Sequence, residues 1–384
     1  DRKQERMAKS MGSGHRVIRG VAGSGKTLVL VSRARLLSQM LPSQKILVTC
    51  FTRSLASQLR KQLSDCPNVD VRNLDRVMDQ TMRDAGVAHP GYAGGNIPVA
   101  KAALDALDKK DGPKFRAVLV DEAQDFDTEA LQFCVRLLEA SEPDAQDLII
   151  VADSAQNIFK KNFRWKDAGV KAQGRTQVLR TNYRNTREIL AFAYAFLTAG
   201  SAIEVQASFD PEDDIGIIPA EASDRTGRSP RVISAGDTVD EIAKVVAAVG
   251  EHHGSRSPAR SIAVLYGEQP HGREAFAVSL SAALLRADLP HFWVTDPDEK
   301  GNRDLAGETD APIVLSTVHS AKGLEFPTVV LCGLGTKSDL ITARKLAYVG
   351  MTRAVNDLAV VVGADSPFRS DLIGGASSVN SHEL

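Results

Sequence analysis

Residues 20–27 carry the spacing G-x-x-x-x-G-K-[ST], which is typical of a loop that binds nucleotide phosphates. Glycines let backbone N–H groups point inward around an anion, and the start of a helix adds the positive end of its dipole. The Lys26 ammonium would then reach the β- and γ-phosphates, and the Thr27 hydroxyl would hold Mg²⁺. The residues expected around the phosphates are Ala22, Gly23, Ser24, Gly25, Lys26 and Thr27. A glycine turn that arose by chance is the alternative.

Two adjacent carboxylates, Asp121 and Glu122, follow the apolar residues 117–120. Carboxylates at the end of a buried strand are costly unless a cation or water chemistry uses them. Beside a phosphate-binding loop, Asp121 would hold Mg²⁺ and Glu122 would orient and deprotonate an attacking water. Acidic pairs also open many helices. Their position behind a hydrophobic strand and downstream of the loop favours the catalytic interpretation.

The elements that must position these residues read as alternating strands and helices. A short apolar strand at 16–19 precedes the phosphate loop, and a helix at 28–37 follows it. Continuous apolar runs at 45–51 and 147–152 are typical of a parallel sheet that is covered on both faces. The alternation predicts βαβ units, and therefore an α/β fold with parallel sheets.

The second half of the chain predicts a second sheet of the same class. Its apolar runs of strand length lie at residues 231–235, 261–266, 291–295, 312–317, 328–334 and 358–362. It carries no second phosphate loop. We therefore expect two domains, 1–175 and 176–384, of which only the first binds nucleotide phosphates by a loop of its own.

Composition restricts the class of protein. The chain has 384 residues, 43% hydrophobic and 25% charged, which indicates a globular protein of two or three domains. Its net charge of −1 means that any nucleic-acid site must be a local groove. No apolar run is long enough to span a bilayer. The cysteines, Cys50, Cys66, Cys134 and Cys332, lie far apart, which argues against zinc, an iron–sulfur cluster or disulfides and favours a cytoplasmic protein.

Taken together, the motifs resemble the superfamily 1 helicases of the UvrD/Rep type, and they occur in that family's order. The matching segments are Walker A at 21–27 (VAGSGKT), Walker B at 120–126 (VDEAQDF), motif III at 152–159 (ADSAQNIF), motif IV at 182–186 (NYRNT), motif V at 316–326 (STVHSAKGLEF) and motif VI at 346–354 (LAYVGMTRA). The resemblance implies two RecA-like domains with ATP in the cleft between them.

The resemblance also implies roles for residues outside the phosphate loop. Arg184 and Arg353 would stabilise the γ-phosphate as arginine fingers from the second domain. A solvated helix charge is the alternative for Arg353. Further nucleotide contacts would come from Gln156 at the γ-phosphate, Gln4 and Tyr183 at the adenine, and Glu325 at the ribose.

Single-stranded DNA would, by the same resemblance, cross both domains. The expected contacts are Phe51, Thr52 and Arg53 of motif Ia, Phe159 and Trp165 of motif III, and His319 of motif V. Aromatic stacking does not depend on base identity, which suits a translocase. A core aromatic is the alternative for Phe51. Trp165 stands later than the family pattern because residues 160–164 look like an insertion.

The sequence also departs from the family. The place of motif Ib, usually Thr-Phe-His, reads VRNLD at 71–75. The stretches between Phe51 and Asp121 and between Arg184 and Thr317 are too short for full-size accessory subdomains. Movement on a strand is therefore better supported than processive unwinding. Short relatives of this kind often follow a nuclease-related domain, so we expect such a domain before Asp1 in a longer protein.

The expected function is ATP hydrolysis with Mg²⁺, driven by single-stranded DNA, with translocation in the 3′-to-5′ direction that the family shows. Three alternatives remain open. The chain would be a nucleotide-gated switch that binds DNA or protein and hydrolyses ATP slowly, a P-loop ATPase that acts on a protein or metabolite, or a motor on RNA.

Overall fold

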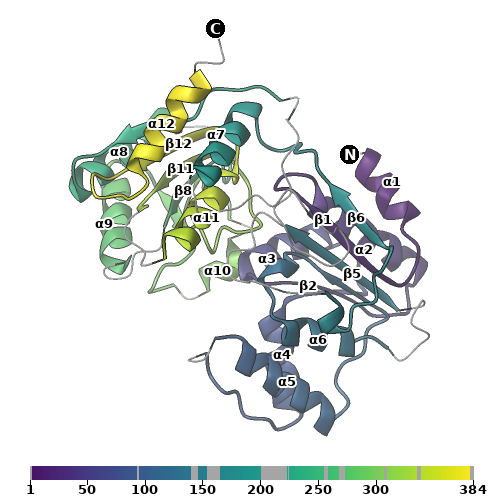
Figure 1. Ribbon diagram of the computed structural model, residues 1–384. Helices are drawn as coiled ribbons and strands as arrows, with labels where there is room; N and C mark the ends of the chain where they lie inside the picture. Colours follow the sequence, from purple (N-terminus) through teal and green to yellow (C-terminus); the bar gives the residue numbers. More distant parts are fainter. Residues whose placement is uncertain are drawn as a thin grey trace. The chain divides into compact units, whose positions relative to one another are not determined.

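The computed structural model describes residues 2–92, 95–139, 146–153, 165–199, 223, 225–254, 258–267, 273–299, 301–306, 309–334 and 339–380. The chain forms two compact units, of which the first ends at Arg180 and the second begins at Thr181. Each unit is built on one six-stranded sheet with helices packed against it (Figure 1). The strand pairs within both sheets are parallel, so the predicted α/β fold with two parallel-sheet domains is confirmed.

The first unit has the strand order β3-β2-β4-β5-β1-β6. Its elements are α1 (Arg2–Ser10), β1 (His15–Gly20), α2 (Lys26–Met40), β2 (Ile46–Cys50), α3 (Arg53–Gln62), β3 (Val69–Asn73), α4 (Leu74–Asp84), α5 (Ile97–Lys109), β4 (Ala117–Val120), η1 (Ala123–Asp125), α6 (Thr128–Arg136), β5 (Asp147–Asp153), η3 (Trp165–Ala168) and β6 (Thr176–Leu179). Strands β4, β5 and β1 are neighbours. Their carboxyl ends, where parallel sheets bind ligands, therefore lie side by side.

Burial on both faces explains why the central strands of this unit are continuously apolar. Every residue of β2, β4 and β5 is buried. Successive side chains of a strand point to opposite faces. In β4, Val118 and Val120 accordingly join the core under α4, α5 and α6, whereas Leu119 joins the core under α1, α2 and α3.

The second unit has the strand order β7-β12-β11-β8-β10-β9. Its elements are α7 (Arg187–Thr198), β7 (Arg231–Ser234), α8 (Thr238–His252), β8 (Ile262–Tyr266), α9 (Arg273–Arg286), β9 (His291–Trp293), α10 (Asn302–Leu305), β10 (Ile313–Thr317), β11 (Phe326–Cys332), α11 (Leu340–Met351), β12 (Ala354–Val362) and α12 (Arg369–Asn380). Helices α8 and α9 cover the core on one face, and α7, α11 and α12 pack together against β7, β11 and β12.

The predicted domain boundary between residues 175 and 176 lies too early. Strand β6 pairs with β1, with Val17 opposite Thr176, and so belongs to the first sheet. The boundary falls between Arg180 and Thr181. An apolar run identifies a strand but not its partner, so the sequence does not reveal that residues 176–179 pair with the first sheet.

The cysteines and the helices also bear on the predicted class of protein. All four cysteines are buried free thiols. Burial raises the pKa of Cys134 to about 12 and raises that of Cys50 and Cys332 well above its ordinary value. Within the described part of the chain, no helix combines the length and the apolar character needed to cross a membrane.

Candidate nucleotide site and nucleic-acid contacts

The phosphate loop connects β1 to α2 at the carboxyl edge of the first sheet. Gly23 and Gly25 have φ angles of 70° and 83°, which lie in the left-handed region that glycine adopts without strain. Gly25 is also the residue from which α2 begins. The predicted strand, glycine turn and helix are therefore present, and the N-terminus of a 15-residue helix opens onto the loop.

Lys26 is held inside the loop by three oxygen atoms. Its Nζ donates to the carbonyl oxygens of Gly20 and Val21 at 3.0 and 2.7 Å. The same ammonium pairs with the Asp153 carboxylate at 3.2 Å, and both side chains are buried. Phosphate oxygens are stronger acceptors for an ammonium than carbonyl oxygens. The group is thus already in the loop and would exchange its carbonyl partners for a phosphate.

Thr27 and Asp121 form the pair of oxygen groups that was predicted to hold Mg²⁺. The Thr27 hydroxyl donates to Asp121 Oδ2 at 2.8 Å. Burial and, next in size, the charge of Glu122 raise the pKa of Asp121 to about 7, although the Thr27 hydrogen bond opposes both effects. A bound cation would offset this burial and repulsion. Both groups offer the hard oxygen ligands that Mg²⁺ prefers.

The two side chains alone do not make a complete metal cage. Among the described residues, no group of three or more His, Cys, Asp or Glu side chains could hold a metal ion. Mg²⁺ usually keeps several waters and is held by one or two protein groups together with substrate phosphates. Thr27 and Asp121 therefore fit a magnesium ion that arrives with the nucleotide.

Glu122 is fixed in place by a residue that the sequence analysis did not single out. The Gln124 Nε2 donates to Glu122 Oε2, and Gln124 Oε1 accepts the backbone N–H of Asp153 at 2.8 Å. Gln124 is 3% exposed. The amide thus joins the end of β4 to the end of β5. Gln124 lies within the quoted Walker B segment, and Asp153 ends β5 directly after the apolar run 147–152. These positions are the signals that could have found the two residues.

The predicted nucleotide residues of the second unit lie at the amino ends of two paired strands. Glu325 precedes β11 and Arg353 precedes β12, and Phe326 N–H donates to Arg353 O at 3.0 Å. The Arg184 Nε pairs with Glu325 Oε2 at 2.5 Å. Tyr183 is 40% exposed. The structure therefore brings Arg184, Glu325 and Arg353 into one neighbourhood.

Arg353 is buried, which contradicts the alternative of a solvated helix charge. Its side chain is 1% exposed. The Nε donates to Val349 O at 3.1 Å and Nη1 donates to Leu324 O at 3.3 Å. A guanidinium buried in this way is held by the backbone in a defined position, which is what a phosphate ligand requires.

The three motif Ia residues follow β2 at the carboxyl edge of the first sheet. Phe51 is half-buried and packs edge-on against Phe126, with ring centroids 5.9 Å apart. The Thr52 hydroxyl accepts the Leu55 N–H at 3.2 Å and so caps α3. Arg53 is the exposed first residue of that helix. Phe51 therefore packs partly into the core, as its alternative predicts, and leaves part of its ring accessible.

The remaining expected contacts divide into three groups. His319 is half-buried in the turn after β10. Trp165 is 3% exposed and belongs to the core of the first unit, so its ring does not offer a face for a base. This burial argues against the expected stacking role. The sequence could not reveal it, because the sequence shows the residue type but not the direction of the ring. Gln156, Phe159 and the side chain of Gln4 lie outside the described residues.

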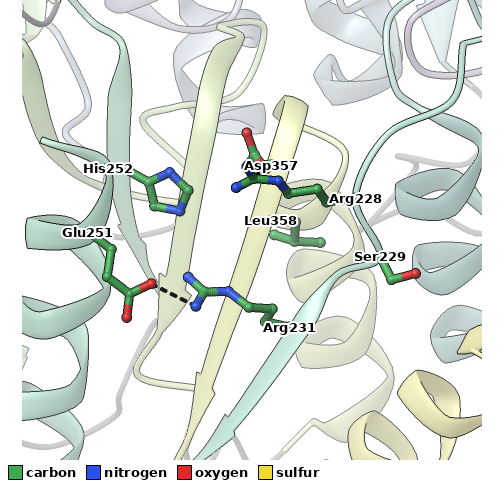
Figure 2. A pocket seen from close by; sticks show the side chains of 7 residues that line it. All are labelled: Arg228, Ser229, Arg231, Glu251, His252, Asp357 and Leu358. Carbon is green, nitrogen blue, oxygen red and sulfur yellow. Dashed lines mark hydrogen bonds and ion pairs between the residues drawn. The ribbon is translucent and has the colours of Figure 1, made fainter.

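A pocket of about 180 Å³ in the second unit is lined by none of the predicted site residues. Figure 2 shows Arg231 of β7 and Glu251 of α8 pointing toward one another across it, at 2.7 Å. It is lined by Arg228, Ser229, Arg231, Glu251, His252, Asp357 and Leu358. Its charged side chains are largely paired with each other, so we assign it no ligand.

Comparison with known families matches both halves of the chain. Residues 3–162 match the model of an AAA domain, which includes the phosphate loop and both acidic residues. Residues 312–361 match the UvrD-like helicase C-terminal domain, which includes Glu325 and Arg353.

Curated relatives are ATP-dependent DNA helicases by name. PcrA of Bacillus subtilis is 36% identical over 102 residues, which are 24% of this chain and 13% of that protein. PcrA of Leuconostoc citreum is 45% identical over 102 residues, again 24% of this chain and 12% of that protein. UvrD1 of Mycobacterium leprae is 26% identical over 203 residues, 48% of this chain and 23% of that protein.

The chain therefore matches at most about a quarter of the length of these relatives. The segments that match the two family models nonetheless include the phosphate loop, the acidic pair and the C-terminal motifs, and they lie on two parallel-sheet units. On this evidence the chain resembles UvrD/Rep-type superfamily 1 helicases in both of its units.

Proposed function

We propose that the chain is an ATP-dependent translocase on single-stranded DNA that moves in the 3′-to-5′ direction and releases ADP and phosphate. The observation that carries the proposal is the group formed by Lys26, Thr27, Asp121 and Glu122 at the carboxyl edge of the first sheet. The names of the relatives, which are ATP-dependent DNA helicases, support DNA as the track.

The proposed chemistry follows from the groups in the first unit. The loop N–H groups and Lys26 bind the phosphates, and Thr27 and Asp121 hold Mg²⁺, which neutralises charge on the phosphate oxygens. Glu122 accepts a proton from the attacking water. Gln124 orients the Glu122 carboxylate, to which it donates a hydrogen bond.

The second unit would contribute positive charge in the transition state. We propose that Arg184 and Arg353 contact the γ-phosphate, that Tyr183 stacks on the adenine, and that Glu325 contacts the ribose. The ion pair between Arg184 and Glu325 supports this scheme because it holds both side chains beside each other. Residues of both units would then contact the same ATP, and hydrolysis would end these contacts.

For the track we propose Phe51, Thr52, Arg53 and His319 as contacts of single-stranded DNA, and we leave Trp165 out. Their positions at the ends of β2 and β10 support this choice, since a half-buried ring and an exposed guanidinium there can meet a base and a phosphate. Contacts of this kind do not read sequence.

Steady-state ATPase measured without nucleic acid, with single-stranded DNA, with duplex and with RNA tests the proposal. We expect strong stimulation by single-stranded DNA, which weakens as salt rises. Lys26→Ala and Glu122→Gln should each lower turnover by at least ~100-fold. Lys101→Ala and Glu129→Gln are matched controls, because this exposed lysine and its glutamate partner form a separate ion pair at 3.7 Å.

Each result has a defined meaning. Turnover that ignores every nucleic acid would favour a nucleotide-gated switch, and stimulation by RNA alone would change the track. Near-normal DNA-stimulated turnover in Lys26→Ala would contradict the mechanism. Displacement of streptavidin from the 5′ end but not the 3′ end of biotinylated strands would establish direction, and a 3′-tailed duplex would show whether movement separates strands.

A further inference from the structure

The side-chain amide of Asn185 joins the segment of Arg184 to the segment of Arg353. Its Nδ2 donates to Thr352 O at 3.1 Å and to Ala354 O at 2.5 Å. These two carbonyls belong to the residues on either side of Arg353. Asn185 is 0% exposed. The buried amide of Asn185 therefore holds the backbone on both sides of Arg353. Asn185 also directly follows Arg184, the other predicted arginine finger, in the sequence.

Asn182 completes the connection from the other side. Its Oδ1 accepts the backbone N–H groups of Arg184 and Asn185, both at 2.9 Å, and its Nδ2 donates to Asn185 Oδ1 at 2.7 Å. The Asn185 side chain thus uses both its donor hydrogens and its acceptor. The orientation of its amide is defined, because backbone carbonyls can only accept.

Arg225 adds a second bridge near the surface. Its Nη1 donates to the Arg184 carbonyl oxygen, and its Nη2 donates to Asn356 Oδ1 at 2.7 Å. Asn356 lies in β12, three residues after Arg353 in the sequence. The Arg184 peptide is therefore held at its N–H by Asn182 and at its carbonyl by Arg225, and both routes lead to the segment around Arg353.

We infer that Asn185 is a positioning residue that fixes the spacing between Arg184 and Arg353, with Arg225 as its surface counterpart. The inference rests on the proposed function, in which both guanidinium groups meet one triphosphate. Charge stabilisation of a transition state depends steeply on placement, and a displacement of about 1 Å can cost ~100-fold in rate. The effect therefore belongs in kcat rather than in ATP binding.

The first test compares kcat and the KM for ATP in single variants. Asn185→Ala should lower kcat by ~10- to 100-fold and change KM little, because ATP is bound chiefly by the first unit. Asn185 is fully buried and its removal could unfold the unit. Arg225→Ala is the safer variant, because this side chain is exposed, and its kcat should fall by roughly 3- to 10-fold.

Arg231→Ala is the matched control for Arg225→Ala. Arg231 is a partly exposed arginine in the neighbouring strand β7, and its ion pair with Glu251 lies in the pocket of Figure 2. This variant removes an equivalent charge, together with its ion pair to Glu251, without touching Arg184. We expect its kcat to match that of the unaltered chain, and its melting temperature to fall about as much as that of Arg225→Ala.

A double-variant cycle separates positioning from general stability. If Arg225 acts through Arg184, then Arg225→Ala should have no further effect on kcat in an Arg184→Ala background. Additive losses, or single variants that behave like Arg231→Ala, would overturn the inference while the proposed function stood. If the unaltered chain hydrolyses no ATP under any condition, the proposed function fails and the inference fails with it.

Discussion

Gln124 connects the carboxylate that follows strand β4 to the end of strand β5 in the first unit. It donates to Glu122 and accepts from the backbone of Asp153, whose own carboxylate pairs with Lys26. The predicted general base and the phosphate-binding lysine are therefore linked by a short chain of contacts. Glu122 also has a φ angle of 54°, a left-handed conformation that residues other than glycine seldom adopt. A strained backbone of this kind persists where its surroundings over-determine it.

Replacement of Gln124 by alanine should lower kcat and leave ATP binding intact. Without the amide, the Glu122 carboxylate loses the donor that orients it toward the attacking water. We expect kcat to fall by roughly 10- to 100-fold, with little change in KM. Steady-state ATPase with single-stranded DNA checks this. Gln132→Ala is a suitable control, because that half-buried glutamine donates to Asp167 O, away from the loop. Equal kcat values in the two variants would remove Gln124 from the mechanism.

At this scale the sequence predicts what is local in the chain and misses what is distant. Lys26 and Thr27 are recognisable because the glycines that hold them are their neighbours. The partners of Asn185 stand 167 and 169 positions later, so no spacing could reveal them. Trp165 shows the converse case, in which a residue type suited to stacking is directed into the core.

Among the elements, the strands at the centre of each sheet are the predictable ones. Their residues are buried on both faces and therefore read as continuous apolar runs. Strand β3 escapes this reading because it is an edge strand in which Asp70 and Arg72 alternate with apolar residues and pair with each other at 2.5 Å. Helix α4, which follows directly, escapes with it.

Gly20 allows strands β1 and β6 to lie close together, and its replacement tests the packing between them. A Cβ at Gly20 would lie 2.7 Å from Leu179 O, in the backbone of β6, and 2.7 Å from Ser24 Oγ in the phosphate loop. A backbone atom cannot give way as a flexible side chain does. Gly20→Ala should therefore destabilise the chain by about 1–3 kcal/mol and weaken ATP binding.

Urea-induced unfolding measures this loss, and Gly250→Ala provides the control. Gly250 lies inside α8, and an added Cβ there meets nothing within 4 Å. Alanine should stabilise that helix by about 0.5–1 kcal/mol. Unfolding curves that move in opposite directions for the two variants are the expected outcome. A Gly20→Ala curve that coincides with that of the unaltered chain would mean that β6 does not pack on β1 as described.

For the whole molecule, the division into two units separates the expected tasks of binding and turnover. The phosphate loop, Asp121 and Glu122 belong to the first unit, whereas Arg184 and Arg353 belong to the second. Each unit also has its own core. This division could be predicted in outline from a single phosphate loop and two sets of strands. Its boundary could not, because strand pairing is a property of the folded sheet.

Arg184→Ala should show the separation directly. Arginine fingers contribute about 10³- to 10⁵-fold to kcat in nucleotide hydrolases, so turnover should fall by roughly 1,000-fold. The rise in melting temperature on addition of ADP and Mg²⁺ should persist, since the loop that binds the phosphates is unaltered. Differential scanning fluorimetry and steady-state ATPase measure the two quantities. Parallel loss of both would indicate that Arg184 supports binding rather than the transition state.

The burial of every cysteine makes the chain well suited to site-specific labelling. Thiol reagents attack the thiolate, and the native thiols are both shielded and raised in pKa by burial. A cysteine introduced at an exposed position would therefore react first, without prior removal of the four native ones. With one such fluorophore on each unit, single-molecule energy transfer would report how the distance between the units changes with each nucleotide.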